Sequence, residues 1–139
     1  KKNNKFDKKK EYIKYHGSIP YKDLHNIYKE SHLGIFASSC ENMPNILLET
    51  MASGLPIACS NRGPMPEILG NAGLYFNPEH SNEIFDALES LITSPQLREK
   101  KAHASFHKVE KYSWSICTKE TFTFLESVIA DYKKSLCVE

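Results

Sequence analysis

The chain has 139 residues, a formal net charge of +1 and 40% hydrophobic residues. A length of this order predicts one domain, and the near-neutral charge argues against a nucleic-acid partner. No apolar run reaches the roughly 18 residues that a membrane-spanning helix needs. The four cysteines form no C-x-x-C pair, which indicates reduced thiols and a cytoplasmic protein.

The N-terminus is strongly basic, with lysine at six of the first ten positions. We interpret residues 1–11 as a solvated tail. The alternative is a basic patch that contacts an anionic surface, which would place the protein at the inner face of a membrane.

Strand and helix patterns alternate along the first part of the chain. This alternation predicts an α/β fold, with a parallel sheet of about four strands flanked by helices. The continuous apolar run 33–37 is typical of a strand that is covered on both faces. We expect strands at 12–16, 33–37, 56–59 and 74–76, and helices at 21–30, 44–53 and 66–70.

The remainder of the sequence is predicted to be helical, with helices at 81–91, 95–111 and 114–133. Ser94 and Ser113 are expected as N-terminal caps, and Pro95 fits the first turn of its helix. Trp114 is expected to anchor the last helix in the core.

The most informative segment is Glu41-Asn-Met-Pro-Asn-Ile-Leu-Leu-Glu49. One carboxylate precedes a helix that Pro44 begins, and the second lies within that helix. Free backbone N–H groups and the helix dipole favour an anion at such a terminus. Carboxylates on either side can hold hydroxyl groups, so the pattern predicts a nucleoside diphosphate carrying a sugar as the ligand.

The segment E-N-M-P-N-I-L-L-E-T-M-A-S-G-L-P resembles the E-x7-E motif of the retaining glycosyltransferases of family 4, which have two Rossmann-like domains (the GT-B fold). Ala37, Asn42 and Thr50 depart from the family pattern, but both glutamates are present. The resemblance covers roughly residues 12 to 132. Further segments that carry it are 16–19, 35–38, 62–68 and 112–114.

The resemblance implies that the chain is the C-terminal, donor-binding domain, and that it is incomplete. It matches strands 3 to 6 of the order 3-2-1-4-5-6, so two strands and the acceptor domain are expected elsewhere. Strand 12–16 must then pair beside 33–37, pair with a second copy, or fray. An unpaired edge and an exposed apolar last helix would favour self-association.

The resemblance also implies roles for the two glutamates. Glu41 would occupy the catalytic position, where a carboxylate stabilises positive charge at the anomeric carbon. Its alternative is to complement the helix dipole. Glu49 would hold the ribose hydroxyls, and its alternative is a solvent-facing position.

The other site residues that the resemblance implies surround the start of the same helix. The backbone N–H groups of Met43, Asn45 and Ile46 would bind the diphosphate, while Pro44 shapes the turn. Ser38 would contact the ligand or bond local backbone. The main chain of Ile19 would lie beside the nucleobase. No metal and no cofactor are expected.

The expected activity is transfer of a hexosyl group, with retention, from a nucleotide-sugar to a glycan or lipid-linked acceptor. The isolated chain is expected to be inactive. One alternative is a non-catalytic nucleotide-binding module. Another is one subunit of a split transferase, whose partner subunit supplies the missing N-terminal domain.

Overall fold

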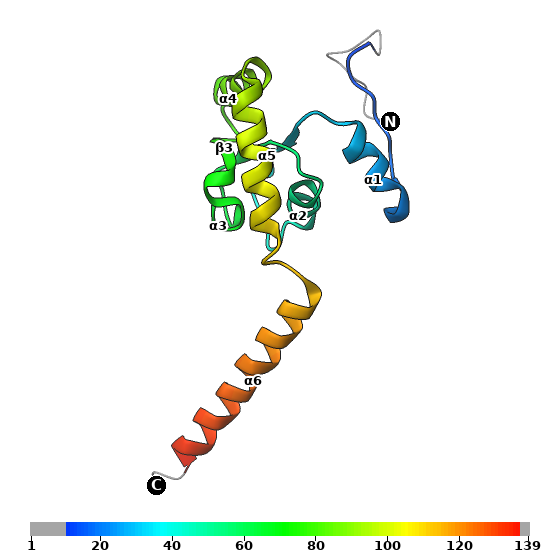
Figure 1. The fold of residues 1–139 in the computed structure, drawn as a ribbon. Coiled ribbons are helices and arrows are strands. Elements are labelled where there is room, and N and C mark those ends of the chain that lie inside the picture. The colour runs from blue at the N-terminus through cyan, green and yellow to red at the C-terminus, as the bar shows by residue number, and fades with distance from the viewer. Residues whose placement is uncertain (1–10, 137–139) are drawn as a thin grey trace. The chain divides into compact units, whose positions relative to one another are not determined.

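The structure is a computed structural model that describes residues 11–136 (Figure 1). The predicted tail, residues 1–11, lies outside the described residues except for Glu11. The chain divides between Glu30 and Ser31 into two compact units.

Residues 11–30 of the first unit contain one helix, α1 (Tyr21–Glu30), as predicted. Leu24, Ile27 and Tyr28 are half-buried on one face of α1. The predicted strand 12–16 is wrong, because these residues form no strand. Tyr12 and Tyr15 are 85% and 88% exposed. So little burial of their side chains contributes little to holding this segment as a strand.

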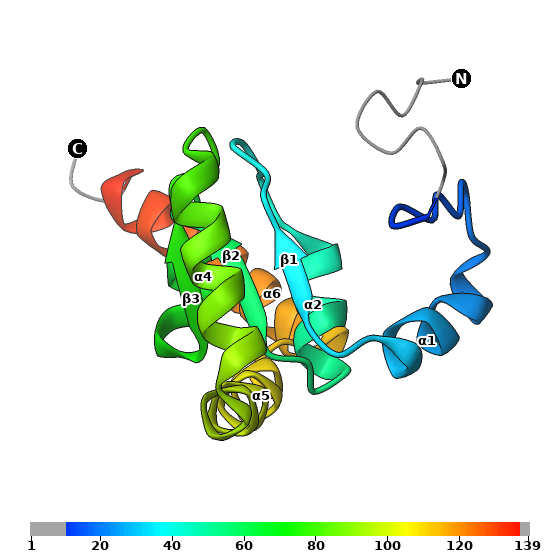
Figure 2. The ribbon, with the colours of Figure 1, turned by 90° about the horizontal axis from the view of Figure 1, so that it is seen from above.

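The second unit contains a parallel sheet of three strands in the order β1-β2-β3 (Figure 2). The strands are β1 (Gly34–Phe36), β2 (Ile57–Ser60) and β3 (Gly73–Phe76). Phe36 pairs with Cys59, and Cys59 pairs with Tyr75. The α/β class and the order of these strands are therefore confirmed, with three strands in place of about four.

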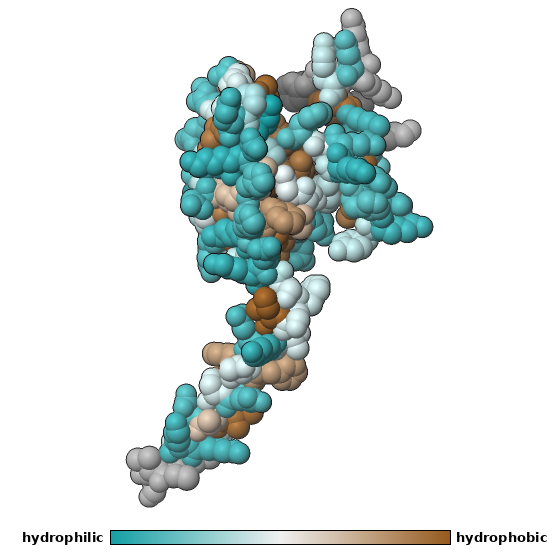
Figure 3. Space-filling model, in the orientation of Figure 1, coloured by the Kyte–Doolittle hydropathy of each residue, from teal (hydrophilic) through white to brown (hydrophobic). Residues whose placement is uncertain are grey.

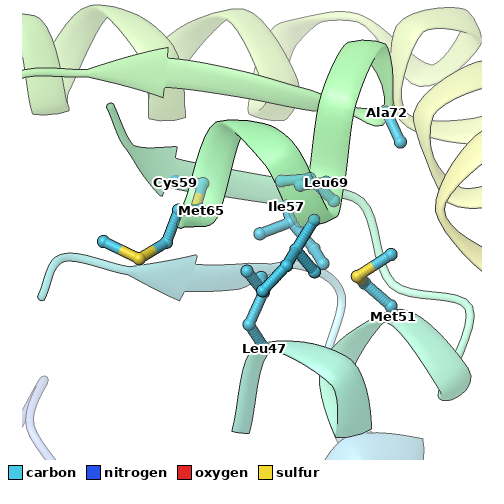
Figure 4. Close-up of a cluster of buried hydrophobic side chains, with 8 residues drawn as sticks. Leu47, Met51, Ile57, Cys59, Met65, Leu69 and Ala72 are labelled. Carbon is cyan, nitrogen blue, oxygen red and sulfur yellow. The ribbon is translucent and has the colours of Figure 1, made fainter. Parts of the chain in front are cut away.

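The central strand β2 is buried along its whole length, and its side chains alternate between two cores. Ile57 and Cys59 face a cluster with α2 (Asn45–Ala52) and α3 (Met65–Leu69) (Figure 4). Ala58 faces a second cluster, whose other buried members are Phe76, Ala87 and Leu91. The sheet is thus covered on both faces, as its apolar strands require.

The helices that follow the sheet confirm the predicted helical C-terminus. They are α4 (Ser81–Thr93), α5 (Pro95–Val109) and α6 (Trp114–Leu136), and a 3-10 turn, Gly70–Ala72, precedes β3. Ser94 caps α5, since its Oγ accepts a hydrogen bond from the Leu97 N–H at 3.3 Å. Ser113 caps α6 in the same way, with the Ile116 N–H at 3.2 Å.

Helix α6 exposes its side chains from Trp114 to Ser135, and hydrophobic surface is visible along it (Figure 3). The expected core anchor at Trp114 is wrong, because this side chain is 83% exposed. The residue that packs against the core is Tyr112, which precedes the Ser113 cap. An exposed apolar surface on the last helix was predicted and is confirmed.

Candidate functional site

Three loops lie at one edge of the sheet. They are residues 37–44 after β1, residues 61–64 after β2, and residues 77–80 after β3. Because all three strands are parallel, their carboxyl ends meet at the same edge. In open α/β sheets this edge is where ligands bind.

Helix α2 begins at this edge, directly after Pro44. Pro44 is fully buried and occupies the N-cap, one position before the first turn where the sequence placed it. Its carbonyl accepts hydrogen bonds from the N–H groups of Leu47 and Leu48, at 3.0 and 3.2 Å. The buried Leu47 side chain fixes this end of α2 to the core.

The backbone N–H groups that are predicted to bind the diphosphate differ in their surroundings. The N–H of Asn45 donates to the Met43 carbonyl at 3.0 Å, so in this conformation it is engaged within the turn. The side chains of Met43 and Ile46 are 48% and 61% exposed. Exposure at these positions leaves the start of α2 open to solvent.

Glu41 is half-buried in the loop that precedes α2. The loop after β2 lies against it: a Cβ placed on Gly63 would be 3.8 Å from the Glu41 carbonyl oxygen. Gly63 has φ of +52°, a conformation that glycine adopts without steric cost. Glu49 is half-buried in the second turn of α2. The structure therefore brings both glutamates to the helix that the sequence motif singled out.

Two further predicted residues have other surroundings. The Ser38 hydroxyl donates to the Cys40 carbonyl at 3.2 Å, which is the local bond that the sequence left as its alternative. Ile19 is half-buried in the first unit. Its placement beside a nucleobase stays a prediction.

A polar network after β3 was missed by sequence reasoning. The Asn77 N–H donates to Glu83 Oε2 at 2.7 Å, and His80 Nδ1 lies 2.7 Å from Glu83 Oε1. Hydrogen bonding from Asn77 and then from His80 lowers the pKa of the Glu83 carboxyl. Arg62 Nη2 donates to Asn77 Oδ1 at 3.3 Å. The sequence feature that could have indicated this network is Asn77, directly after β3, because asparagine side chains at such positions hydrogen-bond nearby backbone groups.

The described residues hold one buried cysteine, Cys59, and two exposed ones, Cys40 and Cys117. Burial raises the pKa of the Cys59 thiol to about 12, so this residue behaves as a core side chain. Within residues 11–136, no group of three or more His, Cys, Asp or Glu is placed to hold a metal ion. No described helix is long and apolar enough to cross a membrane.

The comparison with protein families matches residues 1–94 to the group 1 glycosyl transferases. This chain belongs to that family. The O-antigen chain mannosyltransferase B of Escherichia coli is 29% identical over 110 residues, which are 79% of this chain and 29% of that protein. The gpi3 subunit of the phosphatidylinositol N-acetylglucosaminyltransferase of Schizosaccharomyces pombe is 25% identical over 117 residues, 83% of this chain and 25% of that one.

The fold is similar to that of a sucrose-phosphate synthase from Thermosynechococcus elongatus, with a TM-score of 0.76 and 18% sequence identity. The match covers 86% of this chain and 31% of that one. The chain has the GT-B type of Rossmann-like fold. It spans less than a third of the length of these relatives.

Proposed function

We propose that this chain is the donor-binding part of a retaining glycosyltransferase of family 4, in which a nucleotide-sugar donates a hexosyl group to a glycan or a lipid-linked acceptor. The observation that carries the proposal is the placement of the two motif glutamates. Glu41 precedes α2 at the carboxyl edge of the sheet, and Glu49 lies in the second turn of the same helix. Membership of the group 1 glycosyl transferases supports it.

The chemistry of the proposed transfer gives each residue a role. The bond between the anomeric carbon and the diphosphate oxygen breaks, and a bond to the acceptor oxygen forms on the same face of the sugar. Glu41 stabilises the positive charge that develops on the ring. The diphosphate leaves with the bonding electron pair, next to the N–H groups of Met43 and Ile46 at the start of α2, and its released oxygen accepts the proton of the acceptor hydroxyl.

Glu49 accepts hydrogen bonds from the two ribose hydroxyls in this proposal. Dinucleotide-binding folds hold a ribose with a carboxylate in the same way. Ser38 joins the donor contacts when its hydroxyl leaves the Cys40 carbonyl. No metal or cofactor takes part, and the protein acts in the cytoplasm or at the inner face of a membrane.

The acceptor domain would be supplied from outside these 139 residues, either by further sequence or by a partner subunit, so the isolated chain would be inactive. A split transferase is favoured by one relative that is itself named as a subunit. A non-catalytic nucleotide-binding module is the other alternative. Activity on mixing with a separate acceptor-domain chain would favour the split enzyme over that module.

Calorimetric titration of the 139-residue chain with UDP, GDP and ADP, each with and without an attached sugar, tests the proposal. We expect micromolar to millimolar binding of one of them, which also identifies the base. Absence of binding to all of them would contradict the donor-binding role of this chain.

A further inference from the structure

Arg62 is the one lysine or arginine among the three loops at the carboxyl edge of the sheet, 37–44, 61–64 and 77–80, all of which the structure describes. The same loops carry Glu41 and Glu79. A diphosphate placed at this edge brings negative charge beside these carboxylates. A cation within reach is therefore needed to offset the repulsion.

The backbone at Arg62 is held firmly. Its N–H donates to the Oγ of the buried Ser60 at 3.2 Å, and the Asn61 N–H donates to the Phe76 carbonyl at 2.9 Å. The next residue, Gly63, lies against the Glu41 carbonyl. The backbone of Arg62 is thus fixed next to Gly63, the residue that lies against the loop carrying Glu41.

The guanidinium of Arg62 is exposed and has a neutral partner, Asn77 Oδ1. Within residues 11–136, no carboxylate lies within ion-pair distance of Arg62. The nearby Glu83 uses its two oxygens for the Asn77 N–H and for His80. The positive charge of Arg62 contributes to the lowered pKa of Glu83, but no ion pair occupies the guanidinium, so its two-pronged donor geometry is open to a ligand anion.

We infer that Arg62 binds a phosphoryl group of the ligand held beside Glu41. This inference rests on the proposed function. It adds a residue that the motif does not contain, and it gives that residue a defined chemical partner. Two sources of the phosphoryl group are compatible with the position: the diphosphate of the donor, and the phosphate of a phosphorylated acceptor. The side chain reaches either by leaving one exposed 3.3 Å hydrogen bond, which costs little in water.

Calorimetry on the full chain tests the inference with four probes: the nucleoside diphosphate that binds wild type, its nucleoside, pyrophosphate, and glucose 6-phosphate. The variants are Arg62→Gln, Arg62→Lys and the control Lys100→Gln, which removes one charge from an exposed position on α5. We expect Arg62→Gln to weaken the nucleoside diphosphate about tenfold or more and to leave the nucleoside unchanged. Arg62→Lys should retain part of the affinity, because it keeps the positive charge but loses the two-pronged donor geometry of the guanidinium.

The probes separate the two sources. Loss of affinity for the nucleoside diphosphate and pyrophosphate assigns Arg62 to the donor. Loss for glucose 6-phosphate alone assigns it to a phosphorylated acceptor. Equal losses in Arg62→Gln and Lys100→Gln, or wild-type binding of every probe by Arg62→Gln, overturn the inference while the proposed function stands.

Two more outcomes separate the inference from the proposed function. If wild type binds pyrophosphate as tightly as any nucleotide, and Arg62→Gln loses it, the phosphoryl site is supported and the nucleotide-binding role fails. If wild type binds none of the probes, both fail.

A second variant, Asn77→Asp, keeps the hydrogen-bond acceptor and offers Arg62 a carboxylate. We expect it to weaken phosphoryl binding several-fold, and unchanged affinity would count against the inference.

Discussion

Helices α2 and α6 both have apolar sequences, yet only α2 is buried. Leu47, Thr50 and Met51 of α2 are buried against the sheet, whereas α6 exposes Phe122, Leu125 and Ile129. The difference teaches that apolar periodicity predicts where a helix forms, and that burial depends on a partner surface. For α2 the partner is β2 and α3. For α6 the described residues of this chain provide no such surface.

The largest expected effect separates the two helices directly. Leu47→Ala should lower the free energy of unfolding by about 2–5 kcal/mol, because it leaves a cavity in the core. Leu125→Ala on α6 should change it by less than about 0.5 kcal/mol, because its side chain is exposed. Urea unfolding followed by circular dichroism measures both. Equal losses would mean that α6 packs on the core in solution.

The proposed ligand contact on α2 gives the second effect. Glu49→Ala should weaken nucleotide binding by about 1–3 kcal/mol, because the ribose hydroxyls lose their acceptor. Glu126→Ala on α6 removes the same group far along the sequence and serves as the control in calorimetric titration. Unchanged affinity in Glu49→Ala would remove this residue from the site.

Two glycines with positive φ allow the effect of backbone strain on stability to be distinguished from an effect on nucleotide binding. Gly63→Ala and Gly54→Ala should each destabilise the fold by about 1–2 kcal/mol, because φ is +52° and +67° at these positions and a Cβ is strained there. Only Gly63 adjoins Glu41. Titration of both variants should therefore show weaker nucleotide binding in Gly63→Ala alone. A similar loss in Gly54→Ala would indicate a general effect of stability.

The two serine caps test how far α6 folds independently of the core. Ser94→Ala should cost about 1 kcal/mol of global stability, because α5 packs on the core and loses its cap. Ser113→Ala should lower the helix content of α6 and leave the main unfolding transition in place. Circular dichroism through a urea titration distinguishes them. A shift of the main transition by Ser113→Ala would show that α6 unfolds together with the sheet.

The smallest expected effect is on the stability of the fold at acidic pH. The pKa of Glu83 is lowered in the folded chain from its ordinary value of 4.5 by the Asn77 N–H and by His80. Its contribution to stability is therefore present above pH 4.5 and is lost as pH falls through the folded pKa. In Glu83→Gln, the unfolding midpoint should fall less steeply between pH 5 and 3 than in wild type. Parallel curves would mean that the network does not contribute.

Sequence reasoning predicted the helix of the glutamate motif better than it predicted the edges of the fold. The helix that Pro44 begins was predicted, because its proline and its apolar spacing act between residues that are close along the chain. The strand at 12–16 and the anchor at Trp114 failed, because both depend on what lies next to them. The network of Arg62, Asn77 and Glu83 was missed, because it joins two loops and the start of α4 through residues that lie 15 and 6 positions apart in the sequence.

By itself, the sequence determined the helices, the three parallel strands and the positions of Glu41 and Glu49. Helix caps, turn glycines and apolar periodicity act between residues that are close along the chain. Tertiary structure alone decided which apolar faces are buried and which polar groups meet. It placed Gly63 against Glu41, fixed Arg62 to Asn77 and left α6 exposed, because contacts between distant segments form only when the strands align.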